Sequence, residues 1–155
     1  MKKIDLGQTI SIVANLGFLI GILLLVYELN QNRTAMQAQT RNAIAETLVN
    51  LLALEASTPE LMAMEAKLEA GELLTPAEMR MNANMRTAYQ RFRENVYYQY
   101  RIGLYEESEY TGQREIWARD LNTSEAERNR WCRSRANYSE MYRNEIDSVL
   151  DKPCN

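Results

Sequence analysis

The sequence predicts an all-α protein in which one N-terminal transmembrane helix continues into a small helical bundle. Residues 10–27 form a run of eighteen residues without any charge, which as a helix would cover roughly 27 Å, close to the hydrocarbon thickness of a bilayer. Signals for helix starts recur through the rest of the 155-residue chain. No segment alternates apolar and polar residues between turn signals, so we expect no strand.

The uncharged run is interpreted as an uncleaved membrane span. A signal peptide would need small residues at a cleavage site, whereas after Leu25 the chain reads Val26, Tyr27, Glu28, Leu29 and Asn30. A core helix would show a polar face, but residues 16–26 are apolar all round. We therefore divide the chain into a transmembrane anchor (1–29), a polar helical neck (30–42) and a soluble helical domain (43–155).

Small side chains on the span predict a contact with another membrane helix. Gly17 and Gly21 form a small-xxx-small pair, and Ser11 and Ala14 extend the line. Helices in lipid associate through close backbone approach and interhelical hydrogen bonds. Asn15 adds an amide that needs a partner in hydrocarbon. The alternative is that these glycines are ordinary for a membrane helix and that Asn15 meets water near the headgroups.

Six helices are expected along the chain. The first covers residues 6–56, although its neck has little to bury. The second covers 59–70, after Thr58 and Pro59, and should end at Gly71. The third covers 76–105 and begins with a capping box, Thr75 with Glu78. Three shorter helices are expected at 113–121, 125–133 and 138–150, and Ser124 and Asn137 are their start signals.

Two apolar faces should build the core of the soluble domain. The first helix carries its face after the neck, at Ile44, Leu48, Leu51, Leu52 and Leu54. The third helix carries a seam with spacings of four and three, which is typical of helix packing. Its members are Met81, Met85, Tyr89, Phe92, Val96, Gln99 and Gly103.

Tyrosines crowd the end of the third helix. They are Tyr97, Tyr98, Tyr100 and Tyr105. Core packing or a protein interface explains such amphipathic rings more often than a cofactor does. We treat these four as a candidate protein interface.

Composition argues against most catalytic chemistry. The chain has no histidine, so His-based nucleophilic catalysis, haem ligation by His and ordinary zinc sites are absent. No glycine-rich nucleotide signature is present. We therefore expect no enzyme activity, no catalytic residue, no metal and no cofactor. The net charge of -3 speaks against nucleic acid as a partner.

Two features leave the side of the membrane undecided. Lys2 and Lys3 precede the span and Arg33 and Arg41 follow it, so the positive-inside rule gives two against two. The two cysteines, Cys132 and Cys154, suit a disulfide in an oxidising space and free thiols in the cytoplasm equally well.

Several stretches resemble a family of uncharacterised bacterial single-span membrane proteins with a helical soluble domain. They are the neck ELNQNRTAMQAQTRNAIAE, the short helix after STPEL, and RFRENVYYQYRIGLYEESEY. The resemblance implies an architecture and a bacterial inner membrane, and no activity. Basic residues after the span in that family favour a cytoplasmic domain, whereas the leading MKK departs from the pattern.

The expected function is that of a non-catalytic accessory or scaffold subunit of a bacterial membrane assembly, which binds through its span and its aromatic helix. Its partners would be membrane lipid and other membrane subunits. The alternative is a self-associating single-span module, either a homo-oligomeric pore or a tethered sensor.

Overall fold

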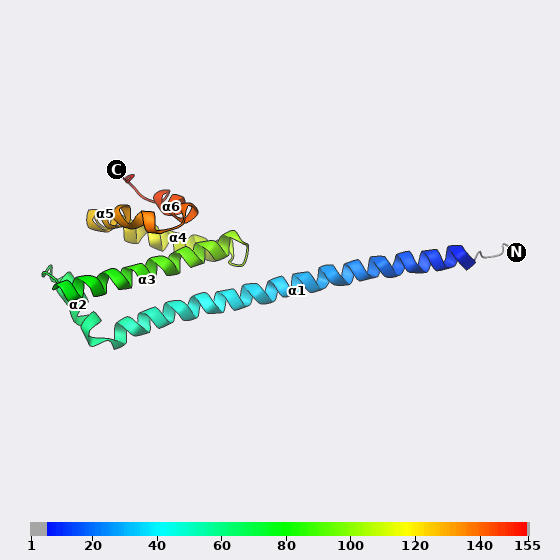
Figure 1. Ribbon diagram of the computed structural model, residues 1–155, viewed down its shortest axis with the longest axis horizontal. Helices are drawn as coiled ribbons and strands as arrows, with labels where there is room; N and C mark the ends of the chain where they lie inside the picture. The colour runs from blue at the N-terminus through cyan, green and yellow to red at the C-terminus, as the bar shows by residue number, and fades with distance from the viewer. Residues whose placement is uncertain (1–5, 155) are drawn as a thin grey trace. The chain divides into compact units, whose positions relative to one another are not determined.

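The computed structural model describes residues 6–154, and this part of the chain is helical with no strand (Figure 1). The expected all-α class is thereby confirmed. The elements in chain order are α1 (Leu6–Ser57), α2 (Pro59–Glu69), α3 (Pro76–Arg101), α4 (Glu107–Asn122), α5 (Glu125–Ser134), the short 3-10 helix η1 (Arg135–Asn137) and α6 (Glu140–Asp147).

The chain divides into two units, one ending at Gln39 and the other beginning at Thr40. The first unit consists of the N-terminal part of α1. This helix is long and apolar enough to be a membrane span or a signal sequence. Its apolar side chains are exposed throughout the most apolar stretch, as Phe18 and Leu23 illustrate at 69 % each.

The second unit is built around α3. Helix α3 contacts α2, α4 and α6, while α5 packs against α4. The core between these helices is unusually aromatic. Its buried members are Ile44, Phe92, Val96, Tyr110, Trp117, Leu121, Trp131, Tyr138, Tyr142 and Ile146. The first three were expected core residues, and their burial is confirmed.

Both glycine-terminated helices end in the same way. Gly71 has a φ of 72° and Gly103 a φ of 76°. The amide N–H of Gly103 donates to the carbonyl of Tyr100 at 2.9 Å, and that of Leu104 donates to Gln99 at 2.9 Å. This pairing is the Schellman motif, in which a residue without Cβ adopts the left-handed conformation. Gly71 ends α2 as expected.

The expected boundary between the third and fourth helices is wrong. Gly103 stops α3 at Arg101 instead of allowing it to reach residue 105, so Gly103 does not belong to the packing seam. The next helix then begins at Glu107 rather than at residue 113. Acidic residues in its first turn suit the positive end of the helix dipole.

Two other expectations also need correction. Helix α6 covers only Glu140–Asp147 instead of 138–150. It begins later than expected because Tyr138 is extended and buried against the ring of Trp131. On α1, Leu48 and Leu51 pack against the core, but Leu52 and Leu54 are 50 % and 51 % exposed. The apolar face is therefore narrower than the run of leucines suggested.

A disulfide joins Cys132 on α5 to Cys154 near the C-terminus, with the two Cα atoms 5.4 Å apart. Both cysteines pack against the core. The bond therefore fixes the segment after α6 to α5.

Candidate functional site

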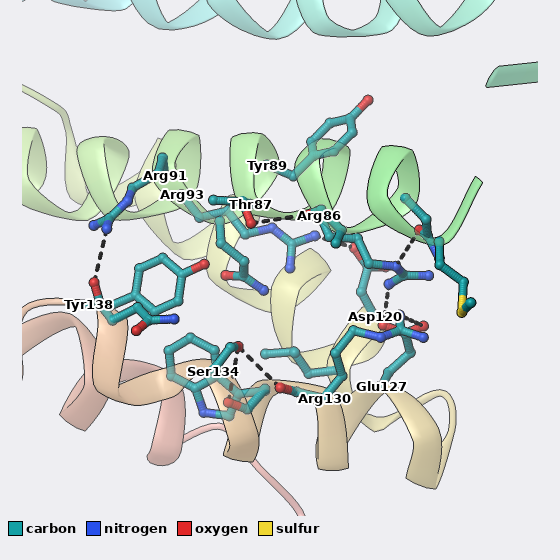
Figure 2. Close-up of a pocket in the computed structure, with 17 residues that line it drawn as sticks. Arg86, Thr87, Tyr89, Arg91, Arg93, Asp120, Glu127, Arg130, Ser134 and Tyr138 are labelled. Carbon is teal, nitrogen blue, oxygen red and sulfur yellow. Dashed lines mark hydrogen bonds and ion pairs between the residues drawn. The ribbon is translucent and has the colours of Figure 1, made fainter. Parts of the chain in front are cut away.

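A groove of about 560 Å³ lies beside α3 and extends to α5 (Figure 2). One wall comes from α3, where Asn82, Arg86, Gln90 and Arg93 recur at spacings of three and four. Such residues share one helix face. Volumes of this size are typical of sites for small molecules.

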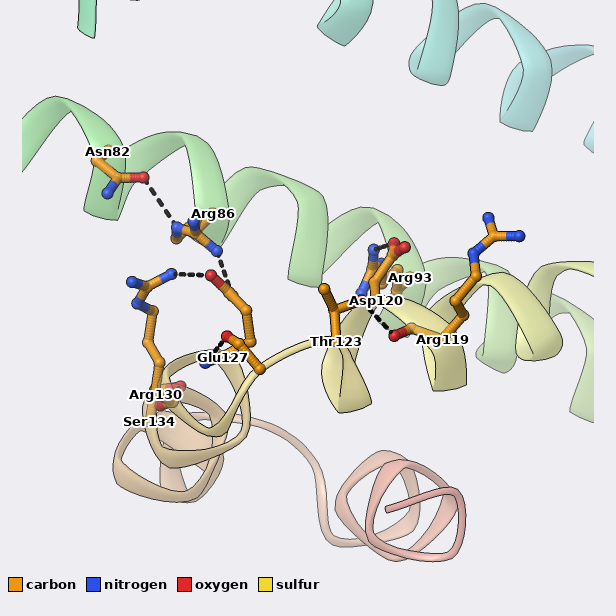
Figure 3. A network of polar contacts seen from close by, with 10 residues as sticks. Asn82, Arg86, Arg93, Arg119, Asp120, Thr123, Glu127, Arg130 and Ser134 are labelled. Carbon is orange, nitrogen blue, oxygen red and sulfur yellow. Dashed lines mark hydrogen bonds and ion pairs between the residues drawn. The ribbon is translucent and has the colours of Figure 1, made fainter. Parts of the chain in front are cut away.

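The opposite wall meets α3 through charged side chains. Glu127 on α5 accepts from Arg86 on α3 through one carboxylate oxygen and, at 2.8 Å, from Arg130 through the other. Asn82 holds Arg86 by accepting a hydrogen bond from its Nε at 2.8 Å. Figure 3 shows this chain of contacts crossing from α3 to α5. A single carboxylate thus serves two guanidinium groups.

The start of α5 explains how Glu127 reaches the groove. Ser124 caps the helix by accepting from the backbone N–H of Glu127 at 3.2 Å. In a full capping box the glutamate side chain would return to the N-cap residue. Here that side chain bonds to the two arginines instead.

A second ion pair closes the groove toward α4. Arg93 donates to Asp120 at 2.7 Å, and its guanidinium lies 6.0 Å from the ring centroid of Trp117. The Arg93 side chain is only 15 % exposed. Packing and charge together fix this arginine in place.

The floor of the groove is apolar. Leu121 and Trp131 are 3 % and 2 % exposed, and Tyr138 is 8 % exposed. Arg91 lies 4.7 Å above the ring of Tyr138 and donates to the carbonyl of Asn137 at 2.9 Å. The groove therefore combines a buried aromatic and aliphatic floor with a rim of arginines.

Behind the floor, Tyr142 joins α6 to α3 by donating its hydroxyl hydrogen to Gln90 at 2.8 Å. Burial raises the pKa of Tyr142 well above its usual range. The hydroxyl consequently stays protonated and acts as a fixed donor at neutral pH.

Two carboxylates outside the groove have pKa values shifted by their neighbours. Burial and the neighbouring Glu55 raise the pKa of Glu65. Burial would also raise the pKa of Glu94, but hydrogen bonds from Ser139 and Arg91 hold it below its usual value. Among residues 6–154, no group of three or more cysteine and carboxylate side chains could hold a metal ion.

The predicted contact residues of the span lie on the first unit. Ser11, Ala14, Asn15, Gly17 and Gly21 are all exposed on α1. A Cβ atom added at Gly17 or Gly21 would meet nothing within 4 Å. The surface needed for close helix approach is thus open within this chain, and the contact itself stays a prediction.

The four candidate interface tyrosines separate into two kinds. Tyr97, Tyr100 and Tyr105 pack against the core, and Tyr100 stacks on Tyr110 with centroids 4.1 Å apart. Tyr98 is 55 % exposed. Their role as an interface stays a prediction, and Tyr98 is the member whose ring faces away from the core.

Sequence reasoning missed the groove because its residues are distant in the chain. Arg130 lies in a stretch with Arg128, Arg133 and Arg135, and such a run of basic residues is typical of a solvated helix face. A usable signal was the polar row from Asn82 to Arg93, which runs along α3 beside the apolar seam.

Comparisons of this chain with protein-family models, with curated proteins and with solved structures give no match. The resemblance of the neck and the aromatic helix to bacterial single-span proteins therefore stays an expectation.

Proposed function

We propose that the protein is a non-catalytic accessory subunit of a membrane assembly, anchored by α1 and bound to its partner through that helix. The observation that carries the proposal is the exposure of the apolar part of α1. None of its most apolar stretch is buried within the chain, so lipid or another protein must cover it.

Contact with another helix is supported by the open backbone at Gly17 and Gly21. Because lipid tails are as apolar as leucine, helix association in a bilayer depends on close packing of this kind. Asn15 supplies an amide on the same exposed helix.

The non-catalytic part of the proposal is supported by the side-chain chemistry. The sequence has no histidine, and the carboxylates at the groove are engaged by arginines. A catalytic site would need a poised acid, base or nucleophile in a cleft.

The disulfide supports an orientation with the second unit in an oxidising compartment. Thiols are kept reduced in the bacterial cytosol, whereas disulfides persist in the periplasm. This argument outweighs the family pattern that favoured a cytoplasmic domain. The setting itself, a bacterial inner membrane, rests on the resemblance.

Crosslinking in native membranes followed by mass spectrometry tests the proposal. The wild-type chain should yield crosslinks to a different membrane protein, and the double change Gly17→Leu and Gly21→Leu should remove that protein from detergent-purified material. Leu16→Ala and Leu23→Ala on the same exposed helix serve as controls. Crosslinks to a second copy alone would favour a self-associating module, and unchanged co-purification of the glycine variant would refute the contact.

A further inference from the structure

We propose that the groove between α3 and α5 binds an organic anion, whose carboxylate contacts Arg130 and Arg86 and whose apolar body covers Met79. This inference uses no residue of the span and does not depend on the proposed function.

The charge of the lining favours an anion. Four arginines and two carboxylates line the groove, which gives a net charge of +2. Arg93 is matched by Asp120, and Arg91 is matched by Glu94 outside the lining. Arg86 and Arg130 share Glu127, and Arg86 also interacts electrostatically with Glu65. The least compensated positive charge of the lining is therefore that of Arg130.

Unused donors lie on the same two side chains. A guanidinium carries five N–H donors. Among the described residues, Arg130 donates one side-chain hydrogen bond, to Glu127 at 2.8 Å, and Arg86 donates to Asn82 and Glu127. Glu127 demonstrates that a carboxylate fits between these arginines, and the remaining donors can donate to the carboxylate of a ligand.

The apolar part of the lining defines the rest of the ligand. Trp131 and Leu121 are only 2 % and 3 % exposed, whereas Met79 on the same lining is 54 % exposed, so an aromatic or aliphatic body on the ligand would cover Met79. The side chains of Arg86 and Arg130 are exposed at 36 % and 37 %. An amphipathic carboxylate satisfies both surfaces, whereas a small inorganic anion would leave Met79 uncovered.

The test uses the full-length protein in a nonionic detergent and 4-phenylbutyrate as the probe, followed by isothermal titration calorimetry with detergent blanks. The neutral amide of the same acid is the matched control ligand. Saturable binding of the acid, with the amide much weaker, is the expected result. Equal binding of acid and amide, or no saturable binding of the acid, would overturn the proposal.

Variants locate the site. Arg130→Gln and Arg86→Gln should each weaken binding of 4-phenylbutyrate by about tenfold or more, since each removes a charge-assisted contact. Arg119→Gln is the matched control, because Arg119 is an exposed arginine of α4 outside the lining. Circular dichroism verifies that each variant is folded. If one of the two arginine variants unfolds, the other variant is sufficient to test the site.

Glu127→Gln should change the affinity for 4-phenylbutyrate in the opposite direction. Removing this carboxylate raises the net charge of the lining and releases both arginines, so binding should become tighter. A purely structural role for the network predicts weaker binding in every groove variant. Loss of binding in Glu127→Gln, or an equal loss in Arg119→Gln, would refute the assignment.

Discussion

Tyr89 connects α3 to α1 through a single hydrogen bond whose strength depends on pH. Its hydroxyl group donates to Glu55 at 2.8 Å. Burial, together with the hydrogen bond to Glu55 and the charge of Glu55, raises the pKa of Tyr89 from 10.0 to about 12. The folded state holds the neutral phenol, so this contribution to stability is complete below pH 10 and is lost as the pH rises through about 12.

Glu55→Gln tests this coupling, because it removes the charge that disfavours the tyrosinate. We expect the pKa of Tyr89 to move toward its ordinary value of 10.0. Spectrophotometric titration of tyrosinate measures the shift, and subtraction of a Tyr89→Phe titration assigns it. An unchanged titration of Tyr89 in the Glu55→Gln variant would contradict the coupling.

Phe92 tests the core at the scale of one side chain. It is 6 % exposed in the centre of α3, so Phe92→Ala leaves a cavity and should lower the free energy of unfolding by about 3–5 kcal/mol. Denaturant unfolding of the full chain, followed by near-ultraviolet circular dichroism, measures the loss. Met79→Ala is the control, since Met79 lies on the same helix and is 54 % exposed. Equal midpoints for the two variants would remove Phe92 from the core.

At the scale of elements, the capping box at the start of α3 makes a prediction of its own. Thr75 accepts from the N–H of Glu78 at 3.3 Å, and Glu78 accepts from the N–H of Thr75 at 2.7 Å. Thr75→Ala should therefore destabilise the protein by about 1 kcal/mol. Thr87→Ala is the control, because Thr87 is an exposed interior residue of α3 that bonds its own helix. Thermal unfolding compares them, and an equal effect of the two changes would rule out the cap.

The same cap responds to acid. Hydrogen bonds from Lys67 and Thr75 lower the pKa of Glu78 from 4.5 to about 2. Because the folded state favours the carboxylate, the cap is at full strength above pH 4.5 and weakens as the pH falls through about 2. The free energy of unfolding of the wild type should fall over that range, and Glu78→Gln should remove this part of the pH dependence, since it removes the carboxylate that titrates.

Local signals predicted where most helices lie, because caps and glycines act on neighbouring residues. Thr75, Pro59 and Gly71 set boundaries that the structure confirms. The position of Gly103 fits the spacing of a helical seam, but in the structure this glycine adopts the left-handed conformation just after the end of α3. Because α3 ends at Arg101, helix α4 can begin at Glu107, six residues earlier than expected.

Long-range contacts were much harder to predict than helices. The largest buried side chains include Trp117, Trp131 and Tyr142, and no local pattern brings them together. The groove likewise depends on Arg86 and Glu127, which are separated by 41 positions. The spacing of Asn82, Arg86, Gln90 and Arg93 gives α3 a polar face, but only the packing of α5 nearby places the carboxylate of Glu127 against it.

At the scale of the whole molecule, the Cys132–Cys154 bond predicts which compartment holds the second unit. The charge rule does not choose a side, since two lysines precede the candidate span and two arginines follow it. A cytosolic location would keep the cysteines reduced. We therefore expect the helical domain to face the periplasm when the chain is made in a bacterium.

Acid quenching of whole cells, followed by alkylation with a maleimide polymer, reports the thiol state by gel mobility. The wild-type chain should react only after reduction, whereas Cys132→Ser should react without it, because the change leaves Cys154 unpaired. Protease added to spheroplasts should digest a C-terminal tag on the same protein. A wild-type chain that is alkylated without reductant and carries a protected tag would place the domain in the cytoplasm, and the disulfide would then lose its value as an indicator of orientation.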